Sequence, residues 1–292
     1  MAEPGDGLKP PRLWARRLVA LAGVGVVVAV VVALVLSLHG GSKTAAPTTT
    51  SAIPPPKPFK IVFPEGFTRA QMAQRVGVVA KIALHEHRGR PHLSTKGYLA
   101  ASAPRRIPGF GAKTLPLEGF LFPALYDFLP KTTNTQLVGS QLLAFLRNWR
   151  TLNLSYARSK NLTPYDVLII ASMIEREAVV PSERPLIAAV IYNRLHEHMP
   201  LGIDATIRYG LNVPGTRALT QSELASDNPY NTRKILGLPP TPISNPGLAS
   251  LQAAANPAKV DYLYFVRKPD HRHHYFTASF QDFVNHEKAY GY

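Results

Sequence analysis

The sequence has 292 residues, no cysteine, and 33 Lys and Arg against 18 Asp and Glu, which gives a formal net charge of +15. A chain without cysteine has no disulfide framework, no cysteine nucleophile and no thiolate metal site. Hydrophobic residues make up 46% of the chain, enough for a folded core, so a wholly disordered protein is excluded. The basic charge suits nucleic acid, anionic lipid or an acidic polymer, and its sign alone does not separate them.

The first predicted element is a membrane span. Residues 18–38 form an uncharged apolar run of 21 residues, long enough as a helix to cross the hydrocarbon of a bilayer. Basic residues crowd the segment before this run, so the positive-inside rule places residues 1–17 in the cytoplasm. A cleaved signal peptide is the alternative, but its apolar region is normally about 7 to 15 residues long. We therefore predict a single-pass protein of the cell membrane with its remainder outside the cytoplasm, where nucleic acid is not the expected partner.

A linker and a small module are predicted next. Residues 39–58 are rich in Pro, Thr and Ser and have no apolar periodicity, which is typical of a semi-extended tether. Alternation over residues 59–63 predicts a strand, and Thr68 with Gln71 forms a capping pair that predicts the start of a helix. We expect a compact module of strand, turn and helix within residues 59–128.

The remaining residues, 129–292, are predicted to form a mainly helical α+β domain. Apolar periodicity predicts helices over residues 135–150, 164–180 and 183–196. The second helix has a hydroxyl cap at Thr163, followed by a proline and then a carboxylate, which all favour a helix start. Its middle is apolar on every side, as in a buried helix, and a Glu-Arg-Glu cluster ends it.

Rigid turns are predicted at residues 237–240 (GLPP) and 244–247 (SNPG). In the second turn, Asn245 is the expected N-cap and Pro246 the first residue of a helix that continues to about residue 255. The expected role of both turns is to hold a loop in one shape.

Glu175, the first residue of the charged cluster, is the leading candidate for chemistry. Ala171 and Ser172 lie one helical turn earlier, so small side chains beside the carboxyl leave room for a ligand. Loss of hydration at the edge of an apolar helix favours the protonated carboxyl, which is the form that a general acid needs. Glu177 points about 200° away around the helix. The alternative is that Glu175 only pairs with Arg176, Arg184 or Arg194 as part of the fold.

Polar and aromatic residues gather in the predicted loops after this helix. Amides, hydroxyls and aromatic faces suit a sugar ring, because each sugar hydroxyl that is buried needs a partner. The same residue types are equally typical of helix ends and turns. The candidates for substrate binding are Ser172, Tyr192, Asn193, Asp204, Thr206, Tyr230 and Asn231.

Histidines occur at residues 85 and 87, 196 and 198, and 271, 273 and 274, but none of these groups has the HExxH spacing that places two imidazoles on one helix face. The sequence also has no Gly-rich phosphate loop and no GxSxG elbow. We therefore expect neither a metal nor a cofactor.

Several short segments follow one another in an informative order. They are residues 117–126 (LEGFLFPALY), 171–177 (ASMIERE), 191–195 (IYNRL), 199–201 (MPL), 237–240 (GLPP), 243–247 (ISNPG) and 261–266 (DYLYFV). In this order they resemble the YceG-like endolytic murein transglycosylases over residues 59–292. The resemblance implies one inner-membrane span, a LysM-like module at residues 59–128 and a catalytic domain at residues 129–292.

The family cuts peptidoglycan glycan strands between N-acetylmuramic acid and N-acetylglucosamine and leaves a 1,6-anhydro end. The resemblance implies that Glu175 protonates the glycosidic oxygen and then accepts the proton of the muramoyl C6 hydroxyl as that oxygen attacks C1. One carboxyl would then suffice, whereas glycoside hydrolysis usually needs a pair about 5 to 9.5 Å apart. The resemblance also implies cell-wall synthases as partners, besides nascent glycan strands and the membrane.

The chain departs from the family's pattern at several positions. Gly202 and Ile203 replace a Gln and a Ser, Thr or Met that are common in the family, Arg233 replaces a Tyr, and Thr241 replaces a Gly. These departures concern substrate contacts more than the acid. Because Glu175, Asn193 and Asp204 are retained, we expect an active enzyme.

Two alternatives stay open at this point. One is a muramidase that hydrolyses the glycan with two carboxylates, the second supplied by Asp204. The other is a noncatalytic scaffold that binds the cell wall through its basic surface and the module at residues 59–128.

Overall fold

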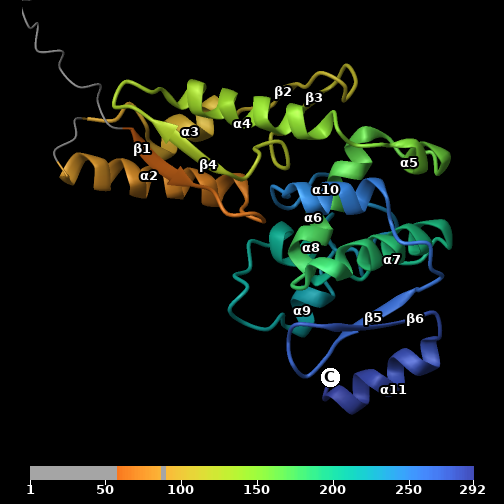
Figure 1. Ribbon diagram of the computed structural model, residues 1–292. Helices are drawn as coiled ribbons and strands as arrows, with labels where there is room; N and C mark the ends of the chain where they lie inside the picture. The colour runs from red at the N-terminus through yellow and green to blue at the C-terminus, as the bar shows by residue number, and fades with distance from the viewer. Residues whose placement is uncertain (1–57, 87–89) are drawn as a thin grey trace, which may run out of the picture. The chain divides into compact units, whose positions relative to one another are not determined.

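The computed structural model describes residues 58–86 and 90–292, whose helices and strands are labelled in Figure 1. These residues form one compact unit of mixed α+β structure, which confirms the predicted α+β class. Within the described ranges no helix is long and apolar enough to span a bilayer. The predicted span at residues 18–38 and almost all of the predicted linker lie outside those ranges. The domain boundary after residue 128 stays a prediction.

The N-terminal elements surround a short antiparallel ladder. They are β1 (Phe59–Val62), α2 (Arg69–His85), α3 (Thr95–Ala101), β4 (Leu125–Phe128) and α4 (Asn134–Trp149). β1 pairs with β4 so that Phe59 lies opposite Phe128, and their rings stack at 5.2 Å. α2 packs against β1 and α3, and α4 packs against α3. The predicted capping box of Thr68 and Gln71 is present, so local sequence sets where α2 begins.

The second group of elements is helical and gathers around α6. It comprises α5 (Ser155–Ser159), α6 (Pro164–Glu177), η1 (Pro181–Glu183), α7 (Arg184–His196), α8 (Asp204–Gly210), α9 (Gln221–Leu224) and α10 (Leu248–Ala255). Helix α6 packs against α7, α8 and α10. Since three helices cover it, its all-apolar middle is explained.

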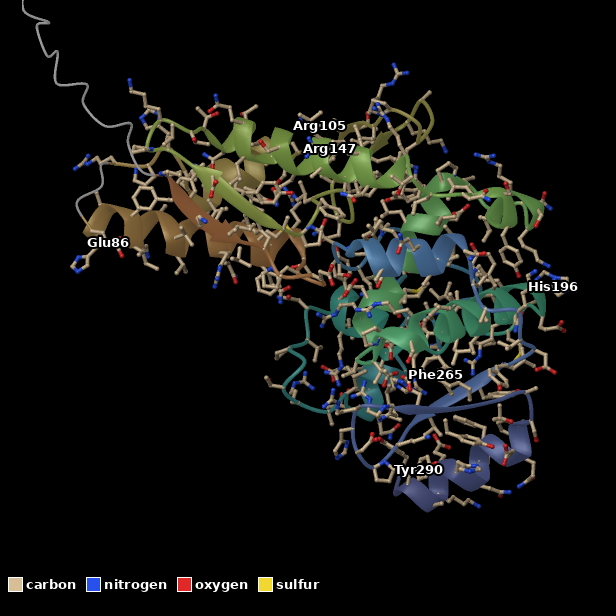
Figure 2. All side chains as sticks on the ribbon, viewed as in Figure 1. Glu86, Arg105, Arg147, His196, Phe265 and Tyr290 are labelled. Atoms are coloured by element: carbon tan, nitrogen blue, oxygen red, sulfur yellow. The ribbon has the colours of Figure 1, made fainter. Side chains whose placement is uncertain are left out.

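Short strands complete the structure. They are β2 (Arg105–Arg106), β3 (Thr114–Leu115), β5 (Tyr264–Arg267) and β6 (His274–Thr277), and the last helix is α11 (Phe280–Tyr290). β2 pairs with β3 and β5 pairs with β6, both antiparallel. Helix α11 packs against the β5–β6 hairpin, and Figure 2 labels Phe265 on β5 and Tyr290 at the end of α11. The buried His274 contacts Glu183 at 2.7 Å, which ties this hairpin to the start of α7.

Helix α6 begins and is buried as predicted. The Thr163 side chain accepts a hydrogen bond from the backbone N–H of Asp166, the Asp166 carboxylate accepts one from the backbone N–H of Thr163, and a proline occupies the first turn. Every residue from Val167 to Ile174 is buried. The helix ends at Glu177, before the predicted residue 180, because Ala178 adopts an extended conformation.

Helix α10 begins later than predicted. Its first residue is Leu248 and its N-cap is Gly247, so the prediction of Asn245 as N-cap and Pro246 as first residue is wrong. The physical reason is that the Asn245 amide is fully used by hydrogen bonds to residues of the N-terminal part. The turn is held by hydrogen bonds to segments that are distant in the sequence.

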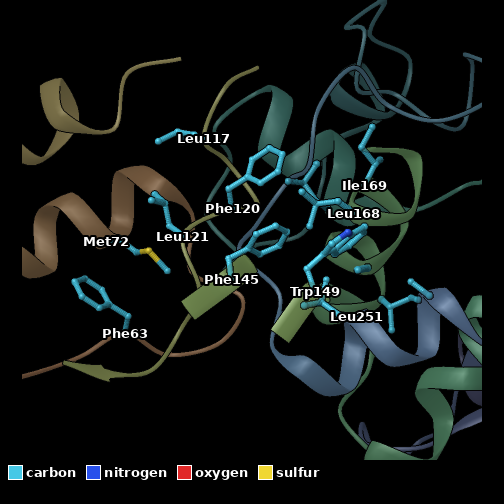
Figure 3. Packing of buried hydrophobic residues seen from close by; sticks show 14 of the residues in the cluster. Phe63, Met72, Leu117, Phe120, Leu121, Phe145, Trp149, Leu168, Ile169 and Leu251 are labelled. Atoms are coloured by element: carbon cyan, nitrogen blue, oxygen red, sulfur yellow. The ribbon is translucent and has the colours of Figure 1, made fainter. Parts of the chain in front are cut away.

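One hydrophobic core includes residues on both sides of the predicted boundary. Figure 3 shows it from Phe63 and Met72 near the N-terminal strand and helix to Leu251 on α10. Between these, Phe120 packs edge-on against Phe145 of α4, with ring centroids 5.1 Å apart. The segment around Phe120 therefore links the two groups of helices through apolar packing.

Candidate active site

The Glu175 side chain lies in the last turn of α6 and is 6% exposed. Its Oε2 accepts a hydrogen bond of 2.9 Å from the backbone N–H of Gly247, at the N-cap of α10. This contact orients the carboxyl, because the buried middle of α6 fixes one end of the side chain and Gly247 fixes the other. Its Oε1 faces Arg184.

The contact between Glu175 and Arg184 is looser. Nη2 of Arg184 lies 3.7 Å from Oε1 of Glu175, which is an ion pair longer than a charge-assisted hydrogen bond. The same guanidinium donates through Nε to Oγ of Ser250 at 3.1 Å. The predicted alternative, a structural ion pair between Glu175 and an arginine, is therefore present only as a long contact. Oε1 of Glu175 can still form a hydrogen bond with another group.

A turn from the N-terminal part lies directly on this carboxyl. Gly66, at a φ of +76°, would place a β-carbon 3.6 Å from Cγ of Glu175. The turn is held by Gly66 N–H donating to Asn245 O at 3.0 Å and by Arg176 donating to Gly66 O at 3.3 Å. A side chain at position 66 would be strained because the backbone is left-handed. The turn thus packs against the side chain of Glu175.

Glu65 belongs to the same turn and was missed in the sequence. A β-carbon at Gly247 would overlap the Glu65 carboxylate, so this carboxylate lies on the residue that binds Glu175. The pKa of Glu65 is raised, chiefly because its carboxyl loses hydration and further by the charge of Glu175 when that carboxyl is ionised, while Arg184 lowers it. The only signal in the sequence is a Pro-Glu-Gly turn, which is too common to identify a site.

A third carboxylate, Glu118, is buried between the start of α2 and the turn before α10. It accepts hydrogen bonds from Arg69 N–H at 2.8 Å, Asn245 Nδ2 at 2.8 Å and Tyr209 OH at 3.1 Å. Burial raises its pKa to about 7, although these hydrogen bonds and the Arg69 charge act in the opposite direction. Because Asn245 also donates to Phe67 O, the Glu118 cluster joins the start of α2 to the turn before α10.

Glu177 and Asp204 lie together on another side of α6. Burial raises the pKa of Glu177, Arg267 lowers it and Asp204 raises it further. Asp204 forms an ion pair with Arg233 at 2.7 Å, with both side chains nearly half exposed. The departure at residue 233 therefore gives Asp204 a cation partner. These contacts place Asp204 with Glu177, whereas the two-carboxylate alternative needs it beside Glu175.

Four of the predicted substrate-binding residues are buried and hydrogen-bonded within the protein. Ser172 donates to Ile169 O and accepts from Ile243 N, Tyr192 donates to Ala254 O, Thr206 donates to Ile203 O, and Asn231 donates to Leu224 O and Ser226 O. All four are at most 4% exposed. Their polar groups stabilise the loops around α6, and their contact with substrate stays a prediction.

The remaining two candidates have mixed environments. Asn193 donates through Nδ2 to the carbonyls of Val260 and Tyr262, which fixes the chain before β5. Tyr230 is partly buried, with its ring 5.2 Å from that of Tyr209 and its hydroxyl 2.8 Å from Thr241 Oγ1. The Thr241 departure thus supplies the hydroxyl partner of Tyr230.

No group of three or more His, Asp or Glu side chains that could hold a metal is found within residues 58–86 and 90–292. A hollow of about 500 Å³ lies elsewhere, between α2 and the start of α3. Its lining includes Leu84, Leu93 and Lys96 but none of the candidate residues.

Comparisons with known proteins bear on this arrangement. A model of the YceG-like family matches residues 41–289. Endolytic murein transglycosylases from Bacillus subtilis (strain 168) and Streptococcus pneumoniae (strain ATCC BAA-255 / R6) are 39% identical over 153 residues and 34% identical over 227 residues, respectively. The alignments cover 52% and 70% of this chain but 42% and 40% of the relatives, so the chain spans less than half of their length.

A crystal structure of a YceG-like protein from Listeria monocytogenes also matches, with a TM-score of 0.62 and 30% sequence identity. The match covers 77% of this chain and 75% of that chain. The shared fold therefore extends over most of the part that the structure describes.

Proposed function

Because the chain belongs to the YceG-like family, we propose that it is a membrane-anchored endolytic transglycosylase of peptidoglycan. It cleaves the bond between N-acetylmuramic acid and N-acetylglucosamine in nascent glycan strands, and it leaves a 1,6-anhydro end. Residues 18–38 anchor it, and the linker keeps it close to the membrane and to the cell-wall synthases. The names of the curated relatives support the reaction class.

The observation that carries this function is the environment of Glu175. The carboxyl is 6% exposed and oriented by the Gly247 N–H on Oε2, which leaves Oε1 to carry the transferable proton. Glu175 donates this proton to the glycosidic oxygen as the C1–O bond breaks. The carboxylate then accepts the proton of the muramoyl C6 hydroxyl while that oxygen bonds to C1. Arg184, at 3.7 Å, stabilises the carboxylate between these steps.

The balance of protons and water in this mechanism can be tested directly. Glu175 ends as it began and no water is consumed, so the anhydro product is lighter than a hydrolysis product by one water. Purified full-length protein is incubated with glycan strands in water labelled with heavy oxygen, and the products are analysed by mass spectrometry. We expect anhydro ends without label. Labelled reducing ends would refute the transglycosylase and support a hydrolase.

The contacts of Asp204 argue against it as the second carboxylate of a hydrolase, because its charged neighbours are Arg233 and Glu177. The noncatalytic scaffold is tested separately. Under that alternative, Glu175→Gln should complement a deletion strain as well as the wild type does, whereas the proposed enzyme predicts no complementation.

A further inference from the structure

The turn that carries Glu65 is fixed against the catalytic region. Its backbone is bonded to Asn245 through Gly66 N–H at 3.0 Å, and its carbonyl accepts from Arg176 at 3.3 Å. Asn245 N–H also donates to Phe67 O at 2.9 Å. With the bond from Asn245 Nδ2 to Phe67 O, four hydrogen bonds at two neighbouring residues hold the turn in place, so the backbone next to Glu65 has a defined position.

That position places the Glu65 carboxylate beside Glu175. Gly247 lies between them: its N–H binds Oε2 of Glu175, while its α-carbon faces the Glu65 carboxylate so closely that a β-carbon would overlap it. Arg184 interacts with both acidic groups. Glu65 differs from Glu175 in its accessibility: its carboxyl is partly desolvated beside Gly247, but the residue as a whole is exposed to solvent.

The charge of this arrangement changes during the proposed reaction. Before proton transfer Glu175 is neutral, and breaking the glycosidic bond creates positive charge on the sugar ring. A fixed group of opposite charge stabilises such a transition state without having to reorient. At that moment Glu65 is the carboxylate of this cluster that is available to an approaching ring.

We infer that Glu65 is a second acidic group of the active site, whose carboxylate faces the muramoyl ring and stabilises the positive charge that develops as Glu175 protonates the leaving oxygen. This inference rests on the proposed function. It gives the N-terminal module a direct part in the reaction, since the module supplies one charged wall of the site.

Glu65→Gln tests the inference, because it keeps the shape of the side chain and removes its charge. We expect kcat for glycan cleavage to fall about 100-fold, within the range seen when one group that stabilises a transition-state charge is removed. KM should change less than threefold, and Glu65→Asp should recover part of the rate. Glu197→Gln, at an exposed position on the C-cap of α7, is the matched control and should behave as wild type.

Gly247→Ala provides a second variant that leaves Glu65 itself unchanged. Its backbone, with φ −77° and ψ 173°, accepts alanine, but the added β-carbon displaces the Glu65 carboxylate. We expect a similar loss of kcat, and the double variant Glu65→Gln, Gly247→Ala should be no slower than the slower single variant. Thermal unfolding of each variant controls for folding.

The outcomes separate the two proposals. If wild type cleaves glycan but Glu65→Gln retains kcat within twofold of the Glu197→Gln control, Glu65 has no such role and the proposed function stands. A rise in KM alone also overturns the inference, because it indicates ground-state binding. If wild type itself cleaves no glycan, the proposed function fails.

Discussion

Two carboxylates, Glu118 and Glu175, are both largely buried but differ in their hydrogen bonds. Glu118 is 6% exposed and accepts three hydrogen bonds, from Arg69, Asn245 and Tyr209. Glu175 accepts one backbone hydrogen bond and lies 3.7 Å from a guanidinium. A carboxylate that accepts several hydrogen bonds within the protein stabilises a fold, whereas one with a more loosely bound oxygen is better placed for proton transfer. The comparison therefore separates a structural acid from a chemical one.

The largest effect is expected from substitution of Glu175, the acid to which we assign the chemistry. Glu175→Gln should lower the rate of glycan cleavage by about 10²- to 10⁴-fold, because the amide cannot donate and then accept the transferred proton. The free energy of unfolding should change by less than about 1 kcal/mol, since Gln still accepts from Gly247 N–H. Initial rates and urea unfolding curves measure the two quantities. A variant that loses both equally would make Glu175 a structural residue.

For Glu118, which we interpret as a structural acid, substitution should chiefly lower the free energy of unfolding. Glu118→Ala leaves the Arg69 N–H, Asn245 amide and Tyr209 hydroxyl without their acceptor. We expect a loss of about 3 kcal/mol or more in the free energy of unfolding, at roughly 1 to 3 kcal/mol for each buried group left unpaired. Urea unfolding followed by tryptophan fluorescence measures it. An unchanged midpoint would show that water replaces the carboxylate without cost.

A smaller effect on the free energy of unfolding is expected when the pH is varied. The pKa of Glu118 is about 7 in the folded protein against 4.5 for the unperturbed group, so between these values the folded state binds more protons than the unfolded state. Stability should therefore fall as pH rises from about 5 to 7, by on the order of 1 to 3 kcal/mol from this group. Glu118→Gln, which resembles the protonated acid, should remove this part of the pH dependence. The difference between wild-type and variant unfolding curves isolates it from other titrating groups.

The smallest effect is expected at the Asp204 and Arg233 pair, which is nearly half exposed on both sides. Arg233→Ala should change the free energy of unfolding by less than about 1 kcal/mol, because solvent screens exposed ion pairs. Glycan cleavage by Asp204→Asn should stay within twofold of wild type. A tenfold loss in that variant would restore the hydrolase that uses Asp204.

Local features of the fold could be predicted from the sequence because local physics decides them. The hydroxyl caps at Thr68 and Thr163 set where α2 and α6 begin, and both were identified from spacing alone. The position of Glu175 at the end of a buried helix follows from the same pattern. The predicted start of α10 was wrong, because the partners of the Asn245 side chain are far away in the sequence.

The surroundings of Glu175 could not be predicted for the same reason. Arg176 reaches Gly66 across 110 residues, and Asn245 reaches Glu118 across 127 residues. No periodicity or spacing encodes such contacts. Ser172, Thr206 and Asn231 show a second limit, since a hydroxyl or amide that can bind a sugar can equally bind a backbone carbonyl. Only the fold determines which partner it meets.

The ladder between β1 and β4 has a mechanical consequence for the site. β1 leads directly into the turn at Glu65 and Gly66, and all four of its residues are paired, from Phe59 with Phe128 to Val62 with Leu125. A pull on the chain ahead of Phe59 must shear this ladder before it can shift the turn. The paired strand β1 therefore prevents tension in the preceding chain from shifting the turn at Glu65 and Gly66.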